Sequence, residues 1–169
     1  MALELNGTTG VSLVQDGVVT AADLASGAIT SAALPTGSVL QVVQGTTTTR
    51  TDTTSQSYVT TALTASITPS STSNKVLCIW TGSAGSDSSG DGRRPAFAVF
   101  LNSVETSQTM TGRVVSNYSL PMPSIYLHSP NSTSAQTFTI YMKSINGNNV
   151  AFLQEIPTTA SIILMEIAG

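Results

Sequence analysis

The sequence predicts an all-β protein, an antiparallel β-sandwich or jelly roll that follows a short N-terminal arm. Short apolar runs, many alternating with polar residues, recur from residue 38 to the C-terminus between turn-forming residues. Ser and Thr account for 50 of the 169 residues and Lys and Arg for only 6, which suits antiparallel sheets with a polar outer face. No part of this region has a long helical period.

Nine segments are expected to be strands, because each is rich in apolar residues and is bounded by turn or loop residues. Residues 38–44 (SVLQVVQ) form an apolar run that suits a buried strand, and Leu63, Ala65 and Ile67 share one face of the next segment. Residues 76–82 form the best core strand. The nine segments are 38–44, 58–69, 76–82, 95–102, 112–118, 124–129, 136–144, 150–155 and 161–168.

The later segments differ in strength. Residues 95–102 are apolar on both faces, whereas Pro121 and Pro123 separate two weaker segments. Phe138, Ile140 and Met142 share one face of the strand 136–144. The Asn-Gly pair that follows predicts a hairpin whose second strand is 150–155, and the last apolar strand is 161–168. Loops are expected at 45–57 (or a solvent-facing hairpin), 83–94 and 103–112.

The N-terminal arm contains two similar decads, residues 16–25 and 26–35. Thr20 and Asp23 resemble a capping box, and Gly27 is placed to end a short helical turn. Such short helices are marginal alone, so the apolar side chains of the arm need a partner surface. We therefore expect an arm at 1–37 that anchors and trimerises the β-sandwich knob at 38–169, through Leu3, Leu5, Val11, Leu13, Val18, Val19, Leu24, Ile29 and Leu34.

Charge and hydropathy exclude several classes of partner. The net charge is −3, and the Arg93-Arg94 pair is isolated, so no basic surface for nucleic acid is expected. No window of 18 apolar residues predicts a membrane-spanning segment, and the first residues, Met-Ala-Leu-Glu, lack the features of a signal peptide.

Candidate catalytic and metal-binding residues are few. His128 is the only histidine, no G-x-S-x-G motif occurs, and no pair of carboxylates stands out, so no enzyme is expected. Cys78 lies in an apolar run and is interpreted as a small buried hydrophobe. The stretch 87–92 has the oxygen spacing of a calcium loop, but position twelve is Ala98, so a plain turn is favoured. No metal or cofactor is predicted.

Three body segments, SVLQVVQ (38–44), SITPSSTSNKVLC (66–78) and SIILMEIA (161–168), resemble tail-fibre and other virion-associated proteins of tailed bacteriophages. The likeness is to marine phages, including those that infect cyanobacteria. The preceding GVVTAADLASGAITSAALPTG (17–37) is similar to fibre-shaft segments. The resemblance implies a homotrimer with bundled arms and an outer β-knob, assembled into a virion in the host cytoplasm.

Three hypotheses follow. The first is a short trimeric fibre or spike that attaches to a capsid or tail protein and contacts host-surface glycans through its loops, with Asp87, Asp91, Arg93 and Arg94 as contact residues. Tyr58, Tyr118 and Tyr126 are candidates for stacking on sugar rings. The second is a capsid decoration or cement protein without receptor contact. The third, an enzyme acting on surface polysaccharide, has the least support in the sequence.

Overall fold

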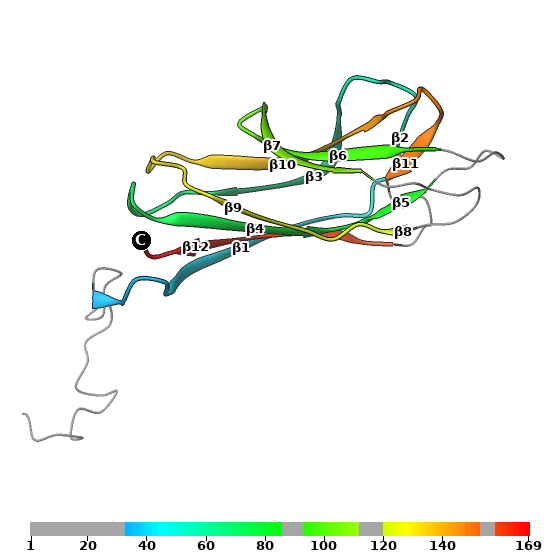
Figure 1. The fold of residues 1–169 in the computed structure, drawn as a ribbon. Coiled ribbons are helices and arrows are strands. Elements are labelled where there is room, and N and C mark those ends of the chain that lie inside the picture. The colour runs from blue at the N-terminus through cyan, green and yellow to red at the C-terminus, as the bar shows by residue number, and fades with distance from the viewer. Residues whose placement is uncertain (1–32, 86–92, 112–119, 153–157) are drawn as a thin grey trace, which may run out of the picture. The chain divides into compact units, whose positions relative to one another are not determined.

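The computed structural model describes residues 33–85, 93–111, 120–152 and 158–169. Two compact units are distinguished along the chain, residues 1–35 and 36–169, and the second contains every strand that the structure describes. These strands pair antiparallel and build an all-β sandwich, which confirms the predicted fold class (Figure 1). Most of the predicted arm at 1–37, residues 1–32, lies outside the described residues, so its short helical turns stay a prediction.

Eight longer strands form two four-stranded sheets. The first sheet has the order β1 (Val39–Thr47), β12 (Ala160–Ile167), β4 (Lys75–Thr81) and β9 (Ser124–His128). The second sheet has the order β3 (Val59–Ile67), β10 (Gln136–Ser144), β6 (Pro95–Leu101) and β7 (Val104–Thr111). Numbered one to eight along the chain, they follow the orders 1-8-3-6 and 2-7-4-5, which is the arrangement of a jelly roll.

A third, smaller sheet joins strands that continue from both large sheets. Its order is β2 (Thr51–Thr53), β11 (Val150–Phe152), β5 (Ser83–Gly85) and β8 (Leu120–Pro121). β5 follows β4 of the first sheet after one residue, and β11 follows β10 of the second sheet. Figure 1 shows these four strands at one end of the sandwich. The small sheet therefore links the two layers by backbone hydrogen bonds.

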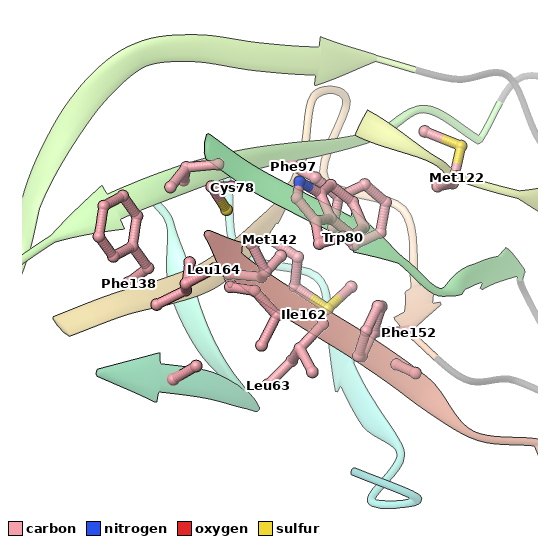
Figure 2. Packing of buried hydrophobic residues seen from close by; sticks show 14 of the residues in the cluster. Leu63, Cys78, Trp80, Phe97, Met122, Phe138, Met142, Phe152, Ile162 and Leu164 are labelled. Carbon is pink, nitrogen blue, oxygen red and sulfur yellow. The ribbon is translucent and has the colours of Figure 1, made fainter. Parts of the chain in front are cut away.

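The core lies between the inward faces of the two large sheets. The Trp80 and Phe97 rings lie 5.7 Å apart between centroids, and so do those of Phe97 and Phe152, in tilted contacts (Figure 2). Aromatic pairs at this separation add to the stabilisation that comes from burial alone. The largest fully buried apolar side chains are Trp80, Phe97, Phe138, Phe152, Leu63, Ile67, Ile140, Met142, Ile162 and Leu164.

Strand β10 shows how the sequence sets the two faces of a sheet. Phe138, Ile140 and Met142 are fully buried, and the intervening Thr137 and Thr139 are only half-buried. Successive side chains of a strand point to opposite faces, so this alternation sends the apolar residues into the core. The predicted one-sided pattern of β10 is confirmed.

The expected loop at 103–112 is wrong for most of its length, because residues 104–111 form strand β7, paired with β6. The connection is a tight turn at Asn102 and Ser103, whose φ values are +49° and +69°. Two consecutive positive φ values are typical of the type I′ turns that join hairpin strands. The turn contains no glycine, so the usual sequence signal for it is missing.

The hairpin expected between 136–144 and 150–155 is also wrong. The second strand, β11, pairs with β2 and β5 instead. The backbone N–H of Ser144 donates to the carbonyl oxygen of Ser55 at 2.8 Å, and that of Ile145 donates to the carbonyl of Arg94 at 2.9 Å. These bonds hold the end of β10 to other segments, and the chain then passes through Gly147, at φ +74°, into the third sheet.

The stretch 45–57 is only partly a loop. Strand β1 continues to Thr47, and β2 forms within the stretch, although the two do not pair as the expected hairpin. Ser55 and Ser57 close a local turn, in which the Ser55 hydroxyl donates to the Ser57 carbonyl at 2.9 Å. Threonine favours strands, and both serine and threonine favour such local turns. The composition of this stretch therefore could not show which of its residues form strands and which form turns.

Gly45 allows two edge strands from different sheets to approach each other. It lies in β1, opposite Ile162 of β12, and a Cβ atom at this position would meet the backbone carbonyl oxygen of Thr64 in β3. The same Cβ would lie 3.1 Å from Cγ2 of Ile162. A backbone atom cannot move aside as a flexible side chain can, so only glycine fits here without a shift of the strands.

We expect Gly45→Ala to lower the free energy of unfolding by about 1–3 kcal/mol, the usual cost of forcing extra atoms into a packed site. Urea denaturation followed by Trp80 fluorescence measures the change. Thr46→Ala, an exposed position on the same strand, is the matched control and should shift stability by less than about 0.5 kcal/mol. Equal effects of the two substitutions would contradict the close approach of β1 and β3.

Candidate functional site

The outer side of the first sheet is apolar, although it faces away from the core. In β12, Ile162, Leu164 and Glu166 point inward and are buried, so Ile163 and Met165 point outward. The register places side chains from all four strands beside these two. Nine apolar residues share this side, termed here the outer apolar face: Val39, Val42, Leu77, Ile79, Ile125, Leu127, Ile163, Met165 and Ile167.

The outer apolar face is continuous across the sheet. One cross-strand row runs from Val42 through Met165 and Leu77 to Leu127. In the next row, Ile163 and Ile79 lie beside Ile125, and Gln44 occupies the remaining position. Cross-strand neighbours on one face of a sheet lie about 4.5–5.5 Å apart, so these side chains form one patch.

The two edge strands leave this patch most open. Ile125 is 66% exposed and Leu127 53% on β9, and Val42 is 57% exposed and Val39 50% on β1. Four strands spaced about 4.8 Å apart, with three apolar rows about 7 Å apart, cover roughly 400 Å². The largest apolar patch on a typical monomer is about 300–600 Å², and patches of that size often have a function.

Along β3 and the first half of β10, the outer side of the second sheet has the opposite chemistry. Its side chains from β3 and β10 form a ladder of hydroxyl groups, in which Thr64 Oγ1 lies 2.9 Å from Thr139 Oγ1 and Ser66 Oγ lies 2.8 Å from Thr137 Oγ1. This side, termed the hydroxyl face, is made by Thr60, Thr64, Ser66, Thr137 and Thr139. The sandwich therefore has one outer side suited to water and one suited to a protein partner.

Glu166 is a buried carboxylate that accepts hydrogen bonds from four donors. Its Oε1 accepts from the Ser70 backbone N–H (2.6 Å), the Ser70 hydroxyl (2.9 Å) and Asn74 Nδ2 (2.6 Å), and its Oε2 accepts from Gln41 Nε2 (2.6 Å). Burial by itself would raise the pKa of Glu166, but these hydrogen bonds together lower it below the ordinary value. The carboxylate thus ties the start of β1 and the turn before β4 to the end of β12.

Cys78 and His128 both point into the sandwich. Burial raises the pKa of the Cys78 thiol to about 12, and the side chain is fully buried in the core (Figure 2), which confirms its interpretation as a small hydrophobe. His128 Nδ1 lies 3.2 Å from the Tyr126 hydroxyl, and its ring meets Phe138 edge-on at 5.9 Å. Burial lowers the pKa of His128, which favours the neutral ring.

The structure describes only part of the predicted site residues. The anchor residues of the arm lie outside the described residues except Leu34, which is 38% exposed. In the predicted contact loop, Asp87 and Asp91 also lie outside them. Arg93 is buried and Arg94 is exposed, so of these two only Arg94 presents its side chain to solvent.

The outer apolar face was missed at the sequence level, although a signal for it was present. Residues 161–168 are apolar at both odd and even positions, and so are 76–82. A strand with this pattern needs cover on both faces. The core supplies one cover, and the pattern therefore indicates that something else supplies the second.

Among the described residues, no three His, Cys, Asp or Glu side chains converge in a way that could hold a metal ion. The described segments also contain no helix of the length and hydropathy that crossing a bilayer requires.

No protein-family model and no curated protein matches this sequence. Among solved structures, the chain is similar to the C-terminal domain of EclA, described as a sugar-binding protein. The TM-score is 0.36 at 12% sequence identity, and the match covers 76% of this chain and 81% of the other. A likeness at this level carries no argument about function.

We expect Glu166→Gln to lower stability at pH 7 by about 1–3 kcal/mol, because one of the hydrogen bonds to a charged acceptor is lost. The pKa of Glu166 is lowered in the folded state, so its contribution is complete above the ordinary pKa near 4.3 and is lost as the pH falls through the folded value. Urea denaturation between pH 7 and pH 2 should therefore show a weaker acid dependence in the variant. Glu105→Gln, at an exposed position, is the control and should leave the acid dependence as in the natural protein.

Proposed function

We propose that this protein is a structural component of a bacteriophage virion, a short trimeric fibre or spike that presents its β-sandwich for attachment to the host surface. The observation that carries the proposal is the outer apolar face, which requires a partner. The sequence resemblance to phage virion proteins supports a place in the virion. The apolar residues of the arm at 1–37 support assembly into a trimer.

Other copies of the same chain are the partner that fits the outer apolar face best. The outward positions of the four strands include one charged side chain, Lys75, at the margin of the patch. Three such faces directed toward a three-fold axis can therefore meet without burying unpaired charges at the centre of the contact, which would be costly. Edge strands β1 and β9 contain no Lys, Arg, Asp or Glu, so charge does not protect them from pairing, and neighbouring subunits would cover them.

The free energy available from this face is of the right order. Full burial of a Val, Leu or Ile side chain stabilises by about 1.5–3 kcal/mol, so covering a half-exposed one contributes roughly 1 kcal/mol. Four of the side chains are exposed by half or more, so the three covered faces of a trimer supply about 12 kcal/mol. Joining three subunits takes two association steps at about 4–15 kcal/mol each, so this gain offsets the lower part of the cost. The less exposed residues of β4 and β12, and the arm, add further stabilisation.

We expect the purified full-length chain to have about three times its monomer mass of 17.4 kDa by light scattering. Leu127→Glu should reduce it to a monomer, because a carboxylate would be buried in the subunit contact. Ser66→Glu, on the hydroxyl face, is the matched control and should stay trimeric. Circular dichroism checks that each variant is folded. A monomeric natural protein, or a trimer unaffected by Leu127→Glu, would overturn the proposed contact.

The role in the virion is tested separately on particles. Gold-labelled antibodies raised against residues 36–169 should decorate purified particles at the tip or sides of the tail, as a host-contacting spike requires. Labelling spread over the head would identify a capsid decoration protein instead. Particles without any label would contradict a virion role altogether.

A further inference from the structure

Three aromatic rings gather on the outer side of the second sheet. Tyr58 precedes β3, Phe100 belongs to β6 and Tyr141 to β10. The rings of Phe100 and Tyr141 stack at 3.9 Å between centroids with an interplanar angle of 20°, and Tyr58 meets Phe100 edge-on at 5.5 Å. All three side chains are partly exposed. These residues are termed the aromatic platform.

Polar groups surround the aromatic platform. The ammonium group of Lys143 lies 4.2 Å from the centroid of the Tyr58 ring. Thr139 pairs with Phe100 across the strands, and Thr60 pairs with Tyr141, so hydroxyl groups flank both stacked rings. Glu105, which is exposed, is the cross-strand partner of Phe100 on β7. The platform is therefore a small apolar surface bordered by groups that can form hydrogen bonds.

Two irregular pairings flank the platform on opposite sides. The register of β3 against β10 shifts between Thr139 and Tyr141, and the register of β7 against β6 shifts between Ala98 and Phe100. β-Bulges of this kind re-aim side chains and are common next to binding sites. The two shifts lie at the level of the stacked rings.

Each irregular pairing is closed by a threonine hydroxyl. Thr61 Oγ1 donates to the carbonyl oxygen of Ile140 at 2.6 Å, and Thr106 Oγ1 donates to the carbonyl of Val99 at 2.7 Å. Ile140 and Val99 are themselves directly paired between β10 and β6. The backbone beneath the platform is thus held from both sides, which gives the rings a rigid support.

We propose that the aromatic platform is a carbohydrate-binding site, with Tyr141 and Phe100 as stacking residues and Lys143 as a hydrogen-bond donor. A pyranose ring has an apolar face of C–H groups and a rim of hydroxyls. It is recognised by an aromatic surface bordered by a few fixed polar groups, the general composition of small-ligand sites. Tyrosine supplies both the apolar body and a polar tip. Mainly uncharged hydroxyl groups border the platform, which matches a glycan better than a strongly charged ligand.

This inference gives a ligand class and a location to the attachment role and rests on the proposed function. It places glycan contact beside the hydroxyl face, on the outer side of the second sheet, and not on the contact residues predicted within 83–94. The outer apolar face and the platform lie on different sheets, so assembly through one leaves the other available. A trimer would carry three platforms, and binding to a surface rich in repeated glycans would then gain from multivalency.

The experiment is a glycan array of bacterial surface polysaccharides and defined neutral and acidic oligosaccharides, probed with the labelled full-length protein. The strongest hit is then measured by calorimetry. The natural protein should bind, and Tyr141→Leu should weaken binding by about tenfold or more, since leucine keeps the apolar bulk but not the aromatic ring. Tyr141→Phe keeps the ring and should retain most of the affinity. Tyr126→Phe, on β9 of the first sheet, is a control that should change nothing.

Each outcome decides the inference. If the natural protein binds no glycan on the array, or if Tyr141→Leu binds as well as the natural protein, the aromatic platform is not the site. Thermal unfolding and light scattering of Tyr141→Leu verify that the variant is folded and trimeric, so a loss of binding cannot come from lost assembly. The folded Leu127→Glu variant should bind single glycans with unchanged affinity. If the natural protein is a trimer but binds no glycan, only this inference is overturned. If it binds glycan but is a monomer, only the assembly proposal is overturned.

Discussion

The first sheet needs cover on both of its faces, and the rest of the structure depends on how that need is met. Its central strands β12 and β4 place Ile162, Leu164 and Trp80 inward, where the second sheet covers them. The same strands place Ile163 and Met165 outward, where the described chain offers no third layer. An antiparallel sheet can leave one side in water only if that side is polar. The described sandwich therefore leaves one apolar side uncovered, and this is the observation on which the proposed assembly rests.

The two outer sides differ in chemistry, and the proposals assign assembly to one and glycan contact to the other. The hydroxyl face pairs its own polar groups, as Thr64 does with Thr139, and its chemistry suits contact with water. The outer apolar face has almost no polar group to satisfy. A jelly roll is used both in viral capsids and in lectins, so the fold by itself favours neither role. The argument for both roles comes from the side chains that this chain places on each face.

Sequence patterns predicted the elements better than their pairing. Alternation located β10 and a continuous apolar run located β12, because both patterns are local properties of the sequence. Strand pairing depends on segments that are distant in sequence. The hairpin expected after β10 was wrong, because the backbone N–H groups at the end of β10 donate to the carbonyl groups of Ser55 and Arg94. The turn at Asn102 and Ser103 was missed because residues other than glycine adopt its positive φ values.

The candidate sites also combine features that the sequence could predict with features that depend on strand pairing. The outer apolar face could have been predicted in part, since residues 161–168 have apolar side chains at both odd and even positions. Its extent could not, because it depends on the strand order β1-β12-β4-β9. The aromatic platform could not, because Tyr58, Phe100 and Tyr141 are far apart in sequence and meet only through the pairing of β3, β10 and β6. Tyr58 had been a candidate for sugar stacking by itself. A single tyrosine at a strand end can serve packing or binding alike. The proposal of a sugar-stacking site therefore depends on the two further rings that the fold places beside Tyr58.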